Sequence, residues 1–208
     1  ERASTSEKQD SVCVAAQQAL DQVMPDIQAV LQQGGTPATD FTLHDAQHGF
    51  RVAERMVEII GDLLDRLSGY ELALLLLSAY LHDIGMTPEK GRVRSLYHHL
   101  LIGEKGNLSS DEIEHFRRWL DIHGEDFEPP LAKLGLTGKT LGDAEWLIAH
   151  YCRERHNDWS GEWIEAHFAG KSFGHYTEWV SDLITLCKSH HYGFDKLRES
   201  HFNPVPVG

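Results

Sequence analysis

The sequence has few cysteines and no long apolar run, and each shortage excludes a class of protein. Its 208 residues contain three cysteines, far apart and in no CxxC pair, which favours reduced thiols and a cytoplasmic location over a disulfide scaffold. The longest apolar run, residues 72–81, falls well short of the roughly 20 residues that a membrane-spanning helix needs. We therefore expect no membrane anchor, and we interpret this run as a buried core helix.

Basic residues are also scarce. Lys and Arg number 19 against 32 Asp and Glu, which gives a net charge of −13. Such a charge repels extended phosphate backbones and argues against a protein that grips duplex nucleic acid. A small phosphorylated substrate or nucleotide held by a metal remains compatible, because a bound cation inverts the local field.

Histidine, in contrast, is abundant, with 14 residues, and the 41% hydrophobic content suffices for a core. Apolar residues recur mostly at helical spacing, and no alternating strand pattern occurs, so the fold class predicted is all-α. The stretch from residue 86 to residue 107 reads as a loop followed by a short helix. The longer helices are expected at residues 11–33 (broken or kinked at Pro25), 46–67, 70–84, 108–124, 141–156 and 176–191.

Two short motifs carry chemistry. "AYLHDIGM" (79–86) ends the buried helix with His82 and Asp83, an imidazole and a carboxylate that suit Mn, Fe, Co, Zn or Mg. Taken alone this pair is weak evidence, because a histidine at a helix C-terminus also favours the helix dipole. The segment "FTLHDAQHGFRV" (41–52) places a further histidine, His48, on the preceding helix. Metal sites in helical proteins are built by side chains of facing helices, so the two motifs together predict a metal site.

Together these motifs resemble the HD-domain metal-dependent phosphohydrolase superfamily, most closely the HD domains of bacterial conflict and stress multidomain proteins, over residues 40–190. The resemblance implies a single HD-type helical bundle at residues 40–208, with its metal site between core helices. Residues 1–39 would form an N-terminal helical extension. The implied cofactor is one or two divalent metal ions, and the implied activity is hydrolysis of a phosphomonoester or phosphodiester, such as a nucleotide or single-stranded nucleic acid.

The same resemblance assigns roles to residues. His48 and His82 would be metal ligands, and Asp83 would bridge two ions and orient the nucleophile. His123 and His156 fall where two-metal members add ligands, although a solvated histidine is the alternative for each. His44 is a candidate for the catalytic acid, or for support of a ligand, and His190 is a second candidate acid.

The family often has lysine directly after its His-Asp-Ile-Gly motif, where this chain has Met86. Lys90 is therefore included as a candidate catalytic residue. Arg92 and Arg94 could bind phosphate. A solvated basic loop is the alternative for all three.

The last family aspartate is also missing, because Lys188 stands at its place in "LITLCKSHH". Asp182 is one substitute, His190 or His191 is another, and we favour an aspartate beyond residue 208 in a longer parent protein. These departures support an alternative function: a catalytically degenerate HD domain that acts as a metal-binding or nucleotide-binding regulatory or sensor module among further domains.

Overall fold

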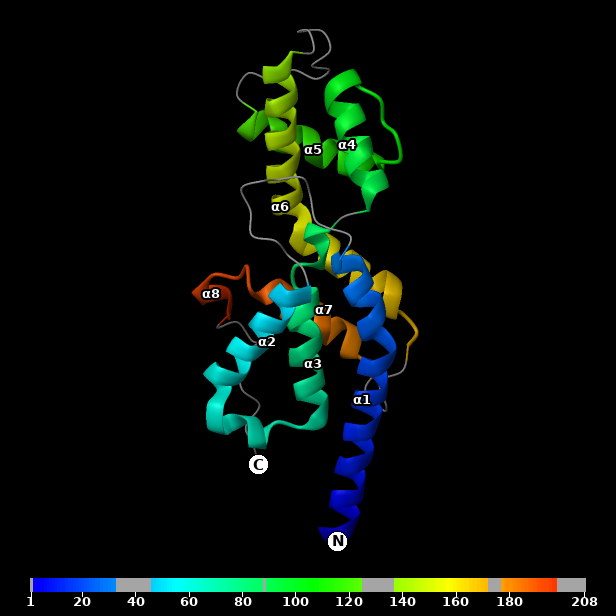
Figure 1. Cartoon of the computed structure of the whole chain (residues 1–208), viewed down its shortest axis with the longest axis vertical. Coiled ribbons are helices and arrows are strands. Elements are labelled where there is room, and N and C mark those ends of the chain that lie inside the picture. The colour runs from blue at the N-terminus through cyan, green and yellow to red at the C-terminus, as the bar shows by residue number, and fades with distance from the viewer. Residues whose placement is uncertain (1, 33–45, 88, 125–136, 172–176, 198–208) are drawn as a thin grey trace.

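The computed structural model describes residues 2–32, 46–87, 89–124, 137–171 and 177–197 (Figure 1). In these ranges every regular element is helical, which confirms the all-α prediction. None of the described helices is both long and apolar enough to cross a bilayer. The elements are α1 (Arg2–Gln32), α2 (Ala46–Ile60), η1 (Gly61–Arg66), α3 (Gly69–Leu81), η2 (Ile84–Met86), α4 (Lys90–Ile102), α5 (Ser110–His123), α6 (Gly138–Phe168), α7 (Trp179–Ser189) and α8 (Phe194–Leu197).

Helix α1 continues past Pro25 without a break. Proline in a helix interior costs roughly 3 kcal/mol, because it removes a hydrogen bond and crowds the preceding turn. Packing offsets this cost here: Val23, Ile27 and Leu31 are buried on one face of α1 and belong to the core that includes α3. A break at Pro25 was therefore a wrong expectation.

Two further helices differ from the sequence-based expectation. Helix α4 begins at Lys90, inside the stretch interpreted as loop, because Ser95, Leu96, His99 and Leu100 form a buried stripe at helical spacing. Helix α6 is 31 residues long and extends beyond residue 156.

The described chain has two hydrophobic cores, and α6 contributes to both. One core lies among α1, α3, α7 and the C-terminal part of α6, around Leu77 and Leu81. The other lies among α4, α5 and the N-terminal part of α6, around Phe116 and Tyr151. Figure 1 shows α6 running along the long axis from one group of helices to the other. Residues near the middle of α6 therefore lie where the two groups meet.

Candidate metal centre

Asp83 lies at the centre of a group of histidines. It follows His82, the C-terminal cap of α3, and precedes η2. One carboxylate oxygen, Oδ2, is 2.9 Å from His82 Nε2 and 3.7 Å from His48 Nε2. The other, Oδ1, is 3.1 Å from His156 Nε2 and 3.5 Å from His190 Nε2. Each oxygen therefore faces its own pair of imidazoles.

The same side chains form two sets of potential metal ligands. The first set is His48, His82 and Asp83, and the second is His156, His190 and His191; within each set the ligand atoms lie within 4.8 Å of one another. In the second set, the Nε2 atoms of His156 and His191 are 3.1 Å apart. Because Asp83 contacts members of both sets, its carboxylate could be shared between two ions.

The ring orientations fit a cation. Nδ1 of His82 lies 3.1 Å from the Ala79 carbonyl oxygen, so this nitrogen must donate to it. In the same way, Nδ1 of His156 and Nδ1 of His190 contact backbone carbonyls three residues earlier in the chain. A neutral imidazole with its proton on Nδ1 presents a lone pair at Nε2, the form in which histidine binds metal. Three such lone pairs directed at one carboxylate would repel it, and a divalent cation or a proton between them removes the repulsion.

The electrostatics of Asp83 suit a ligand. Burial alone raises the pKa of this carboxyl group, but when the Nε2 atoms carry protons, the hydrogen bonds that Asp83 accepts from His156, His190 and His82 outweigh burial and hold the pKa far below its usual range. For His190, burial lowers the pKa, while the hydrogen bond with Asp83 outweighs burial and raises it. Asp83 is therefore ionised at neutral pH, as a metal ligand must be.

A buried serine fastens the His82-Asp83 turn to α6. Ser160 Oγ donates to the His82 carbonyl at 2.9 Å and accepts from the Gly85 backbone N–H at 2.9 Å. Gly85 is required for this contact, because a Cβ at that position would lie 2.0 Å from the His156 carbonyl oxygen. The close approach of η2 to α6 thus places His156 against Asp83.

Most of the predicted ligands come together in this centre, namely His48, His82, Asp83, His156 and His190. His123 does not belong to this centre. Its ring lies against Trp119 at a centroid distance of 4.8 Å, outside both ligand sets. Asp182 also lies elsewhere: its carboxylate accepts a hydrogen bond of 2.7 Å from Tyr70 Oη. His191, considered only as a substitute for the missing aspartate, belongs to the second set.

The predicted phosphate-binding residues lie apart from the histidines. Lys90 and Arg92 line a cavity of about 420 Å³ whose lining includes Gly85 but none of the five clustered histidines. Arg92 forms an ion pair of 3.0 Å with Glu162. Arg94 is exposed on α4. His44 lies outside the described residues.

An all-helical domain with a His-Asp pair at the end of a core helix defines an HD-type domain, and comparison with known families agrees. The HD-CE family matches residues 38–208, so the chain belongs to the HD-CE family. This match confirms the resemblance to the HD superfamily, while closeness to conflict and stress proteins stays a prediction. Comparisons with curated proteins and with solved structures gave no match.

Proposed function

We propose that this domain is a metal-dependent phosphohydrolase that acts on a small phosphomonoester or phosphodiester, with nucleotides and single-stranded nucleic acid as the substrate class. The observation that carries the proposal is the position of Asp83, whose two oxygens face separate pairs of Nε2 atoms. The HD-type fold is a second support.

The residues divide the work as follows. His48 and His82 would hold a cation on one side of Asp83, and His156, His190 and His191 would hold one on the other. Divalent cations supply Lewis-acid chemistry, because they polarise a phosphoryl oxygen and lower the pKa of bound water.

Asp83, ionised and buried, would accept a hydrogen bond from the attacking water and orient it. His44 remains a candidate for protonating the leaving oxygen, and His190 remains one only if it does not itself hold a cation. The donor set is rich in imidazole, which favours Fe, Co or Zn over Mg among the divalent metals.

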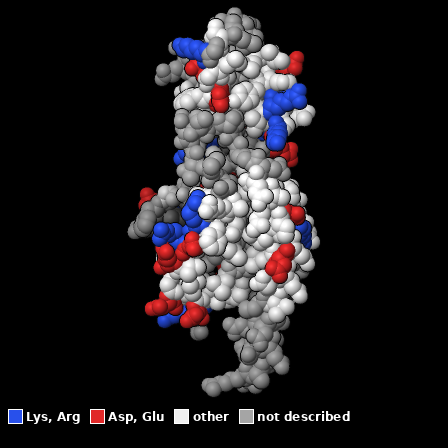
Figure 2. Space-filling view, viewed as in Figure 1, with Lys and Arg blue, Asp and Glu red and all other residues white. Residues whose placement is uncertain are grey.

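The surface charge supports a small substrate. On the face shown in Figure 2, the coloured basic residues alternate with acidic ones instead of forming a continuous patch. With a net charge of −13, the chain gains little from a long phosphate backbone. A metal-held phosphoester needs no such patch.

The test is metal content and turnover in matched variants. We expect His82→Ala and Asp83→Ala to lose bound metal and phosphoesterase activity while circular dichroism stays helical. His167→Ala is the control, since this histidine is exposed and stacks on Trp163 instead of facing Asp83. Elemental analysis, followed by a phosphoester panel with Mn, Fe, Co, Mg and Zn, provides the readout. Unchanged metal content in Asp83→Ala would refute the site.

A second candidate function is a degenerate module that binds metal or nucleotide without hydrolysis, in a protein with further domains. The observation that favours it is that Asp83 is the single carboxylate in the two ligand sets of the described residues. In addition, Lys188 pairs with Asp158 at 3.3 Å, and Met86 is buried. Stoichiometric metal without turnover of any phosphoester would support this candidate over the hydrolase.

A further inference from the structure

A cavity of about 450 Å³ adjoins the metal centre between α5 and α6. His191 belongs both to its lining and to the second ligand set. The volume falls within the range of small-ligand sites, roughly 300–1,000 Å³. A ligand in this cavity would therefore have one end beside the candidate metal centre.

Aromatic rings from both helices line the cavity. On α5, the rings of Trp119 and His123 are in tilted contact, with a centroid distance of 4.8 Å. On α6, the rings of Trp146 and His150 are 4.0 Å apart and tilted by 37°. Trp146 is 49% exposed, which is unusual for so large an apolar ring. Exposed, supported aromatic rings are the surfaces on which nucleic-acid bases stack.

The polar lining suits a base better than a phosphate. Arg153 contributes a cation and Glu154 a carboxylate, while the Asp158 carboxylate in the same lining is paired with Arg155 and Lys188. The Glu154 carboxylate would repel a phosphate and accept hydrogen bonds from the N–H groups of a base or from ribose hydroxyls. The phosphate of a bound nucleotide would accordingly lie outside this cavity, toward His191.

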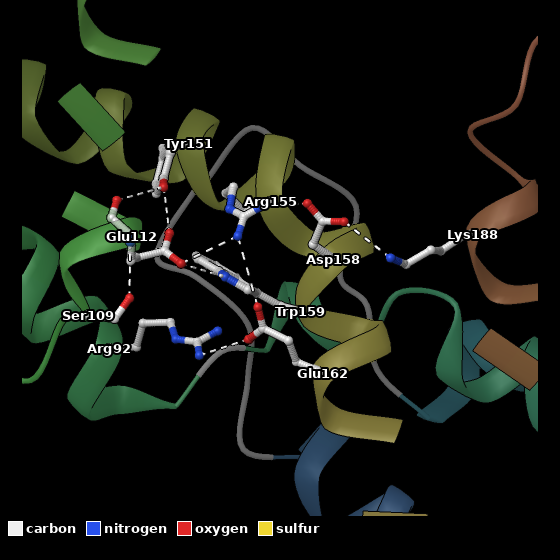
Figure 3. Close-up of polar contacts among 9 residues, drawn as sticks. All are labelled: Arg92, Ser109, Glu112, Tyr151, Arg155, Asp158, Trp159, Glu162 and Lys188. Atoms are coloured by element: carbon white, nitrogen blue, oxygen red, sulfur yellow. Dashed lines mark hydrogen bonds and ion pairs between the residues drawn. The ribbon is translucent and has the colours of Figure 1, made fainter. Parts of the chain in front are cut away.

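A buried polar network joins α5 to α6 and so fixes the positions of the two aromatic pairs relative to each other. Glu112 of α5 accepts hydrogen bonds from Tyr151 Oη and, at 3.4 Å, from Trp159 Nε1 of α6. It also forms an ion pair of 3.5 Å with Arg155, and Figure 3 shows how these side chains face one another. Because these contacts fix α5 against α6, the cavity is preformed instead of depending on a ligand to assemble it.

We propose that this cavity binds the base of a mononucleotide whose phosphoester lies at the metal centre. The position of the phosphate rests on the proposed function, whereas binding of the base does not. Trp146 is the stacking residue, and the carboxylate of Glu154 selects a neutral hydrogen-bonding group.

The first experiment uses nucleosides, which carry no phosphate, and the full chain treated with chelator. Adenosine and uridine are titrated calorimetrically into the wild type and into Trp146→Ala, Trp146→Phe and Trp163→Ala. Trp163→Ala is the matched control, because Trp163 stacks on a histidine four residues later in the same helix, at 3.9 Å, but lines a different cavity. Circular dichroism and thermal melting establish that each variant is folded.

We expect at least one nucleoside to bind, with affinity reduced about tenfold in Trp146→Ala because stacking is lost. Trp146→Phe and Trp163→Ala should stay close to wild type. Absence of binding by both nucleosides, or equal binding by wild type and Trp146→Ala, would overturn the proposal.

The second experiment separates this proposal from the proposed function. With metal added, AMP should bind at least tenfold more tightly than ribose 5-phosphate in the wild type, and Trp146→Ala should remove most of that difference. Equal affinities for the two phosphates in the wild type would refute base binding. Nucleoside binding by a chain that takes up no metal even after incubation with excess divalent ion would support the cavity and refute the hydrolase.

Discussion

Replacement of Ser160 by alanine would remove the contact that fastens the metal-binding turn to α6. The Ser160 hydroxyl is fully buried and is shared by two backbone groups, the His82 carbonyl and the Gly85 N–H. Alanine fits the same space but offers neither a donor nor an acceptor. The substitution therefore leaves two polar groups without this partner on the turn that carries Asp83.

The magnitude follows from those two groups. A buried polar group left without its partner costs about 1–3 kcal/mol, so with two such groups Ser160→Ala should lower the free energy of unfolding by about 2–6 kcal/mol. That is a large share of the roughly 5–15 kcal/mol that stabilises a typical domain. His82 lies in the turn that Ser160 contacts, and His156 lies one helical turn before Ser160. Because the substitution would loosen the positions of both candidate ligands, metal affinity should fall about tenfold or more.

Urea unfolding and metal competition with a chelator measure the two effects separately. The control is Ser95→Ala: Ser95 is also buried, donates to the Gly91 carbonyl at 2.8 Å and accepts from the Asn107 N–H at 3.0 Å, but it lies in the other core. We expect both variants to be destabilised and only Ser160→Ala to lose metal affinity. The reasoning is refuted if Ser160→Ala binds metal as the wild type does, or if both variants lose it equally.

Two further predictions concern the network around α6. Burial raises the pKa of Glu112, but the Tyr151 hydrogen bond and the Arg155 charge outweigh it and lower the pKa below the ordinary 4.5. The stability that Glu112 contributes is thus complete above pH 4.5 and is lost as pH falls through the lowered pKa. In urea unfolding, the free energy of unfolding of the wild type should exceed that of Glu112→Gln by about 2 kcal/mol at pH 7, and by less at pH 3. An equal difference at both pH values would contradict this prediction. Lys188→Asp should not increase metal content in elemental analysis, because Lys188 faces Asp158 at 3.3 Å. The substitution should lower the free energy of unfolding by at most about 1 kcal/mol. A gain in metal would show that the side chain at position 188 reaches the candidate ligands.

The helix that the sequence predicts best is the one whose buried residues are nearly all apolar. In helix α3 the buried residues are leucine and alanine, with Ser78 as the exception. The start of helix α4 was missed, and the helix was expected to be short, because its buried stripe includes Ser95 and His99, which a hydrophobic pattern does not count. Local propensity also misled at Pro25, where tertiary packing outweighs the cost of proline.

The residues of the candidate site also differ in how far the sequence predicts them. His82 and Asp83 could be predicted because a buried apolar helix has little other use for such a pair. The role of Gly85 is visible only in three dimensions, since it depends on how closely the His156 carbonyl approaches. Whether His123 could be a ligand depends on the face of α5 that it occupies, which the sequence alone does not show. Its ring lies against Trp119, four residues earlier, and lines the neighbouring cavity instead of the candidate metal centre.

The end of α7 shows how imidazoles come to lie in the candidate metal centre, although Lys188 stands where the resemblance implies an aspartate. Leu183 and Cys187 mark the buried face of this helix, and Lys188, one residue further round, contacts Asp158. The helix ends at Ser189, and the following turn brings the next two side chains, both imidazoles, to Asp83 and His156. The candidate ligands are therefore set by where the helix stops, which cannot be inferred by aligning "LITLCKSHH" with the family motif. With five imidazoles in the two ligand sets, Asp83 carries their only formal negative charge, which is why its loss should cost more metal affinity than the loss of any single histidine.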